Sequence, residues 1–217
     1  MDLTINILIY VHAFFGGLGL VTGIISASIK KGSLTHKKAG KIFSYAMVTS
    51  SLISLFVARM PGHENLFLFL IGVFTLYMVL AGNRALTFKS KIKLKADTVD
   101  YLISGTMLLT SAVMIIIGTL GIIQKNDNNV LFIFFGGFGI LLTLNDFKTF
   151  RTFRENRDAR LKSHLGRMIG ALIASTTAFM IAGLNIGTLF IWILPSILGT
   201  GYIIYWTRKL RLEKAAI

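Results

Sequence analysis

Residues 5–29, INILIYVHAFFGGLGLVTGIISASI, are followed directly by the basic segment 30–41, KKGSLTHKKAGK. The first stretch contains no charged side chain and exceeds the roughly 20 helical residues that a bilayer requires. Asp2 is the only charge before it, and the basic residues come after it, which is the reverse of a secretory signal peptide. We therefore expect a retained first transmembrane helix whose N-terminus lies outside the cell.

Apolar runs and polar connections alternate along the rest of the chain. Further runs occupy residues 42–58, 66–86, 99–123, 130–147, 168–184 and 187–206. When successive connections are assigned to opposite sides, 21 of the 23 Lys and Arg residues share one side, and only Arg59 and Lys125 take the other. The positive-inside rule places the basic side in the cytoplasm. The sequence thus predicts one all-α domain, 1–217, a polytopic membrane bundle of about seven transmembrane helices with its N-terminus out and its C-terminus in.

Composition agrees with this architecture and excludes several others. The chain is 54% hydrophobic and only 15% charged, with a mean hydropathy of +0.71, so a soluble domain would lack the polar surface it needs. Cysteine is absent, which excludes disulfides and thiolate metal sites. The net charge of +14 lies in the connections, where it suits anionic lipid at the cytoplasmic face better than nucleic acid. A membrane-protein partner or a homo-oligomer remains open.

A weak internal repeat organises the predicted helices. The segments 14–19 (FFGGLG) and 134–139 (FFGGFG) fall at matching places in the first and fifth helices. Arg84 and Asp146 likewise occupy matching inner ends of the third and fifth helices. We interpret the chain as three parallel hairpin repeats plus a closing seventh helix. An ion pair between Arg84 and Asp146 would offset the cost of placing either charge near hydrocarbon.

His12 is the one histidine expected within the membrane. On a helical wheel it shares a narrow stripe with Gly16, Gly19 and Gly23, and glycines mark a stripe where helices pack. We expect the imidazole to point into the bundle. An ionisable group in that position is a functional candidate, and the alternative is a neutral histidine bonded to a neighbouring hydroxyl or carbonyl.

His36 and His164 form a second kind of candidate at the cytoplasmic side. Each is expected at the start of an outward-running helix, near cations such as Lys41 and Arg167. Each follows a residue predicted to cap its helix, namely Thr35 and Ser163. Helix N-termini with neighbouring cations favour anions, so these residues predict a site for a phosphate or carboxylate head group.

The spacing of the histidines limits the chemistry. His12 and His36 are separated by 24 residues, mostly helix at 1.5 Å each, so they lie near opposite faces and do not share one zinc ion. A separate histidine site in each leaflet would instead suit haem, for which His12 is the candidate ligand. No P-loop, GxSxG or HExxH pattern occurs, so the chain matches none of the enzyme classes that these motifs mark.

Several of these residues together resemble a known family. The ordered set is His12-x3-Gly16, Lys31-Gly32-x3-His36-x3-Gly40-Lys41, Gly82-x-Arg84, and His164 before a Ser/Thr-rich helix. It is similar to a family of bacterial multi-spanning proteins catalogued only as a domain of unknown function. The resemblance implies a bacterial cytoplasmic (inner) membrane protein and adds weight to His12, His36 and His164. It implies no activity.

Three hypotheses for function follow. The first is a histidine-based binding or redox module, in which His12 contacts a cofactor or lipid-soluble ligand and the His36 and His164 face holds an anionic head group. The second is a small-molecule carrier or permease that uses hydroxyl groups near the middle of the even-numbered helices. The third is a scaffold subunit of a membrane complex, with the basic loops as its contact surface.

Overall fold

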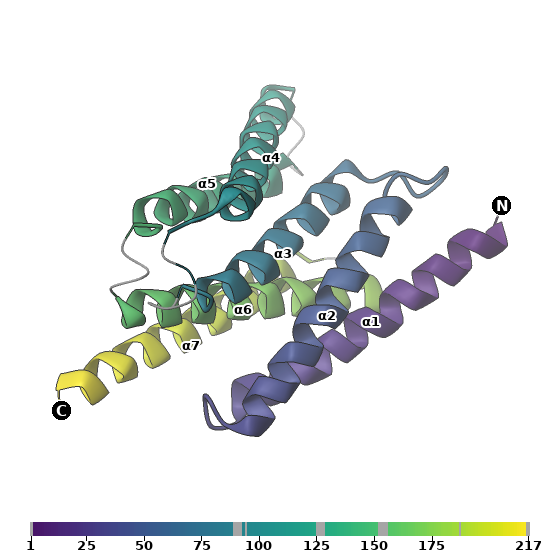
Figure 1. The fold of residues 1–217 in the computed structure, drawn as a ribbon. Helices are drawn as coiled ribbons and strands as arrows, with labels where there is room; N and C mark the ends of the chain where they lie inside the picture. Colours follow the sequence, from purple (N-terminus) through teal and green to yellow (C-terminus); the bar gives the residue numbers. More distant parts are fainter. Residues whose placement is uncertain are drawn as a thin grey trace.

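The computed structural model describes residues 2–88, 93, 95–124, 129–151, 156–186 and 188–215, and those residues form a bundle of long helices (Figure 1). The α-helices are α1 (Asp2–Ser28), α2 (Leu34–Val57), α3 (Leu66–Ala85), α4 (Thr98–Ile123), α5 (Val130–Thr149), α6 (Arg157–Ala178) and α7 (Leu189–Ala215). A short π-helix, η2 (Phe179–Gly183), continues α6.

Seven helices in the described part of the chain are long and apolar enough to cross a membrane, which confirms the predicted number. The chain termini lie at opposite ends of the bundle, as an odd number of spans requires (Figure 1). We call the end at which α2, α4 and α6 begin the basic end, because the Lys- and Arg-rich segments flank these helix starts.

Two helices begin earlier than the apolar runs predict. The α2 helix starts at Leu34, where the Ser33 side chain caps it by accepting a bond from the His36 N–H. The α6 helix starts at Arg157, capped by Asn156. Hydropathy detects the part of a helix that lies in hydrocarbon, so the polar first turns escape it. The predicted caps Thr35 and Ser163 are therefore wrong, since both lie inside helices.

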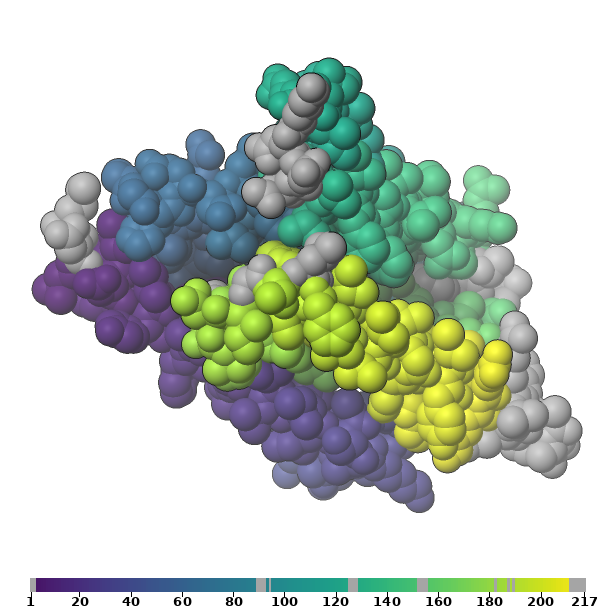
Figure 2. Space-filling model, turned by 180° about the vertical axis from the view of Figure 1, so that it is seen from behind, coloured from purple at the N-terminus to yellow at the C-terminus, as the bar shows by residue number. Residues whose placement is uncertain are grey.

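The helices do not group as the predicted repeat suggests. The closest pairs are the α1–α2 hairpin and the α4–α5 hairpin, while α3 packs on α6 between them. Seen from behind, α7 covers the region between the two hairpins (Figure 2). The α4–α5 hairpin contacts the rest of the bundle mainly through α3. The grouping into three parallel hairpins is not what the contacts show.

The repeated FFGG segments nevertheless share one packing role. A Cβ atom at Gly16 would lie 3.3 Å from Ser50 Oγ in α2, and one at Gly136 would lie 2.9 Å from the Ser111 carbonyl in α4. The middle glycines of both segments have no such neighbour within 4 Å, namely Gly17 and Gly137. The sequence repeat thus marks the two places where one helix of a hairpin approaches the other closely.

Lys31 closes the basic end of α1. Its ammonium group donates to the carbonyl oxygens of Ser26 and Ala27. The Tyr202 hydroxyl donates to the same Ala27 carbonyl at 2.6 Å. Burial lowers the pKa of Lys31. The same Nζ lies 5.4 Å from the Tyr202 ring centroid and 5.2 Å from that of Trp206. These contacts satisfy carbonyls that a helix end leaves free, and they attach α7 to the end of α1.

Candidate functional site

The His12 imidazole is held by α2. Its Nδ1 lies 2.9 Å from the Ser50 carbonyl oxygen, and Ser50 Oγ in turn donates to the His12 carbonyl at 3.0 Å. A carbonyl oxygen only accepts, so a neutral imidazole here donates from Nδ1 and keeps its lone pair on Nε2. Ser50 Oγ also lies 2.9 Å from Nδ1, but its own proton goes to the His12 carbonyl. Gly19 and Gly23 pack on the same side, against Met47 and Phe43, which confirms that the predicted stripe faces the bundle.

The His36 imidazole is held in the same manner at the basic end. Its Nδ1 lies 3.0 Å from the carbonyl oxygen of Ser26 in α1. In the neutral imidazole the proton is therefore on Nδ1 and the lone pair on Nε2, and Ser26 Oγ, 3.1 Å from Nδ1, is a second acceptor for that proton. His36 occupies the first turn of α2, as predicted, although Ser33 caps the helix.

His164 lies two turns inside α6, so its predicted place at a helix N-terminus is wrong. Its Nδ1 lies 2.9 Å from the carbonyl oxygen of Gly82 in α3, which fixes the same tautomer a third time. His36 is held by α1 and His164 by α3, and no hydrogen bond joins the two imidazoles among the described residues. Lys41 is exposed, with Nζ 5.8 Å from the Tyr45 ring centroid.

Arg167 does not contribute to an anion site at a helix start. Its guanidinium is buried and pairs with Asp146 of α5, and each side chain is only 3% exposed. Tyr77 donates to Asp146 Oδ2 at 2.6 Å, and Ser104 donates to the same oxygen at 3.0 Å. Arg167 also donates to Ser163 Oγ at 2.5 Å. Four helices, α3 to α6, thus meet at one buried carboxylate.

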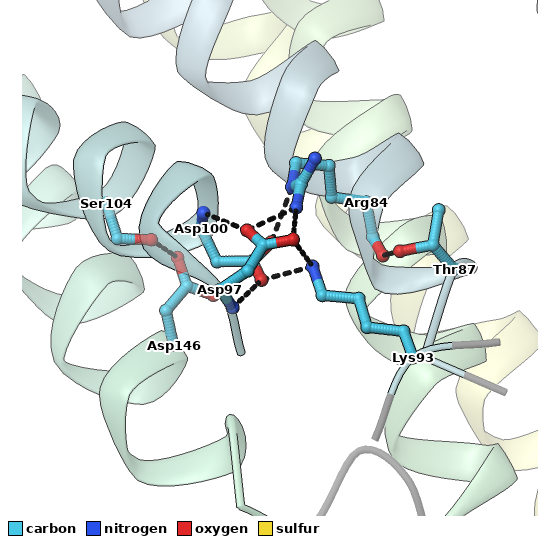
Figure 3. Close-up of polar contacts among 7 residues, drawn as sticks. All are labelled: Arg84, Thr87, Lys93, Asp97, Asp100, Ser104 and Asp146. Carbon is cyan, nitrogen blue, oxygen red and sulfur yellow. Dashed lines mark hydrogen bonds and ion pairs between the residues drawn. The ribbon is translucent and has the colours of Figure 1, made fainter. Parts of the chain in front are cut away.

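The predicted ion pair between Arg84 and Asp146 is wrong, because each residue has other partners. Arg84 Nε donates to Asp100 at 2.5 Å, and its NH2 group donates to Asp97 at 2.6 Å. Lys93 joins the same carboxylates (Figure 3). Asp97, which caps α4, and Asp100 in its first turn therefore lie beside Arg84 at the end of α3.

A small cavity separates the two charge networks. It has a volume of about 10 Å³, room for roughly one water molecule, and Arg84, Asp100, Ser104 and Asp146 are among its lining residues. Ser104 points from α4 toward Asp146 (Figure 3). The polar interior of the bundle therefore continues from the basic end to the Asp146–Arg167 pair.

Asp97 caps α4 and is a titratable group outside the spans. Partial desolvation raises its pKa, but hydrogen bonds from the Asp100 N–H, Lys93 and Arg84 outweigh that effect and lower the pKa from 3.8 to about 2. A depressed carboxylate pKa stabilises the fold above the unfolded-state value, and this contribution disappears as the pH falls through the folded-state value.

We expect the stability difference between the wild type and Asp97→Asn to shrink between about pH 5 and about pH 2. Asn retains a cap and loses the charge, so it isolates the titration. Thermal unfolding in detergent across this range measures the difference. A gap that stays constant or widens on acidification would contradict the assignment. Because Asp97 is half exposed, the effect is small.

Comparison of the chain with protein-family models, curated proteins and solved structures finds no match. The similarity to a bacterial membrane family therefore remains a prediction, and the site must be judged from its own chemistry. Among the described residues, no group of three or more His, Asp or Glu side chains is placed to hold a metal ion.

The sequence did not predict Tyr77 and Ser104. A single phenol in an apolar helix and one serine among many carry no pattern of their own. The one available signal was Asp146 itself, because a carboxylate inside the membrane needs several hydrogen-bond donors around it.

Proposed function

We propose that this protein is a histidine-based binding module that holds haem within the membrane. One observation carries the proposal: His12, His36 and His164 each present Nδ1 to a backbone carbonyl of a neighbouring helix. Metal-binding histidines are commonly oriented by such a bond, which fixes the tautomer and makes Nε2 the better ligand. No hydrogen bond to Nε2 is found for these imidazoles within the described residues.

The donor set fits haem better than a bare metal ion. A structural or catalytic zinc ion needs three or four protein ligands, and the described residues offer no such group. A porphyrin supplies four nitrogens itself, so one or two imidazoles complete the iron coordination. When bound, haem would supply one-electron chemistry. The residues of this chain would supply axial ligands and the apolar surroundings that set the potential.

The carrier hypothesis is less well supported. The hydroxyls that suggested it are largely engaged within their own helices, since Ser111 donates to the Met107 carbonyl and Thr176 to that of Leu172. Such bonds are ordinary for membrane helices. The Asp146 carboxylate is paired with Arg167, not held ready for a transported cation.

The surroundings of the module are part of the proposal. We place the basic end in the cytoplasm, where its Lys and Arg side chains would contact anionic lipid. Exposed apolar side chains on α1, such as Tyr10 and Phe14, would face lipid, a membrane-protein partner or a second copy.

We expect the full-length protein in detergent to develop a Soret band when ferric haem is added. The band should be absent from a variant in which His12, His36 and His164 are all replaced by Ala. His63 lies in the loop between α2 and α3, outside the helices, so His63→Ala serves as the matched control and should bind like the wild type. Absorption spectroscopy with haem quantification measures both results. A wild type that stays colourless, or a triple variant that binds equally well, would disprove the proposal.

A further inference from the structure

The α1–α2 hairpin carries one sequence motif twice. His12-x3-Gly16-x9-Ser26 in α1 is repeated in α2 as His36-x3-Gly40-x9-Ser50, with all three residues displaced by 24 positions. The first motif begins near the N-terminal end of α1, and the second begins at the basic end of α2. Because the helices are consecutive and antiparallel, the histidine of each motif falls opposite the serine of the other.

The contacts show that this pairing is reciprocal. Nδ1 of His12 lies 2.9 Å from the Ser50 carbonyl, and Nδ1 of His36 lies 3.0 Å from the Ser26 carbonyl. The Ser50 hydroxyl donates to the His12 carbonyl at 3.0 Å, and the Ser26 hydroxyl donates to the His36 carbonyl at 3.4 Å. The two ends of the hairpin therefore hold their imidazoles by the same set of bonds.

The glycine of each motif completes the arrangement. A Cβ at Gly16 would lie 3.3 Å from Ser50 Oγ, and one at Gly40 would lie 3.4 Å from Ser26 Oγ. A residue larger than glycine would press on the serine that orients the imidazole. Every element of the motif thus serves the same end, which is a fixed ring with its Nε2 lone pair available.

The two imidazoles are too far apart to serve one ligand. Ser26, the partner of His36, follows His12 by 14 residues on the same helix, which corresponds to about 21 Å along its axis. The hydrocarbon core is about 30 Å thick, so one imidazole lies in each half of the membrane.

We infer that the α1–α2 hairpin is a two-site unit that binds two haem molecules per chain, one through His12 and one through His36. This inference rests on the proposed function and adds the stoichiometry and the division of the sites.

The test is a haem titration of the full-length protein in detergent, with haem and protein quantified separately. The wild type should bind two equivalents, His12→Asn and His36→Asn should bind one each, and the double variant should bind none. Asn suits this purpose because its amide N–H can replace Nδ1–H toward the serine carbonyl, while it offers nothing in place of Nε2. Gel filtration confirms that each variant stays folded.

The outcomes separate the two claims. A wild type that binds one equivalent, lost in only one of the variants, retains the proposed function and overturns the two-site inference. Asn variants that still bind two equivalents also overturn it, since the motif would then serve helix packing alone. A wild type that binds no haem overturns both. The wild-type stoichiometry needs no substitution and therefore decides even if a variant misfolds.

Discussion

Asp146→Ala should lower the free energy of unfolding by about 3–5 kcal/mol, the cost of leaving one member of a buried ion pair without its partner. Arg167 is 3% exposed, and no other carboxylate pairs with it among the described residues. The substitution also removes the acceptor for the Tyr77 and Ser104 hydroxyls. Unfolding by SDS in mixed micelles measures the loss.

The matched variant replaces both charges by apolar residues of similar volume, Asp146→Leu with Arg167→Met. Replacing a complete buried pair is often neutral or stabilising, so most of the loss should be recovered. Tyr77→Phe removes two hydrogen bonds, one donated to Asp146 and one accepted from Arg167, and should cost about 1–3 kcal/mol. An Asp146→Ala protein as stable as the wild type would show that the pair does not form.

Gly139→Ala and Gly137→Ala should change stability in opposite directions. A Cβ at Gly139 would lie 2.1 Å from Ser111 Oγ and 2.7 Å from Met107 Cε, and both of these residues are fully buried in α4. Overpacking at such a contact costs about 1–3 kcal/mol. At Gly137 nothing lies within 4 Å, so Ala there gains up to about 1 kcal/mol of helix propensity.

The pair of glycine variants is its own control, because the residues lie on one helix two positions apart and receive the same change. The same SDS titration compares them. Equal effects at both positions would mean that α5 does not approach α4 along the face that contains Gly139.

The number and position of the membrane-spanning helices follow from the sequence because hydrocarbon admits only long apolar helices. Their full extent does not, as α6 shows: its polar first turns begin at Arg157, well before the apolar run. The caps that mark such starts were present in the sequence as Ser33 and Asn156. An N-cap is marked by a single residue type, and Thr35 and Ser163 are residues of that type too, so the sequence alone did not identify the true caps.

The candidate site was predicted in part. The inward direction of His12 follows from glycine spacing, which reports where helices approach. The partners of charged residues are harder to predict, because matching positions in a sequence repeat do not show which side chains lie opposite each other. Arg84 therefore pairs with Asp97 and Asp100 at the start of the next helix. Asp146 pairs with Arg167 of α6, a helix that the predicted repeat grouped with α5 without indicating this pair.

The attachment of the α4–α5 hairpin has a consequence for biogenesis. This hairpin meets the remaining helices mainly along α3, and its ion pair to α6 forms only once α6 is in place. Separately inserted helices associate afterwards within the bilayer. We expect the Asp146 carboxylate to have no cationic partner until α6 has inserted. A chain truncated before α6 should therefore be recognised as misassembled and degraded by membrane proteases.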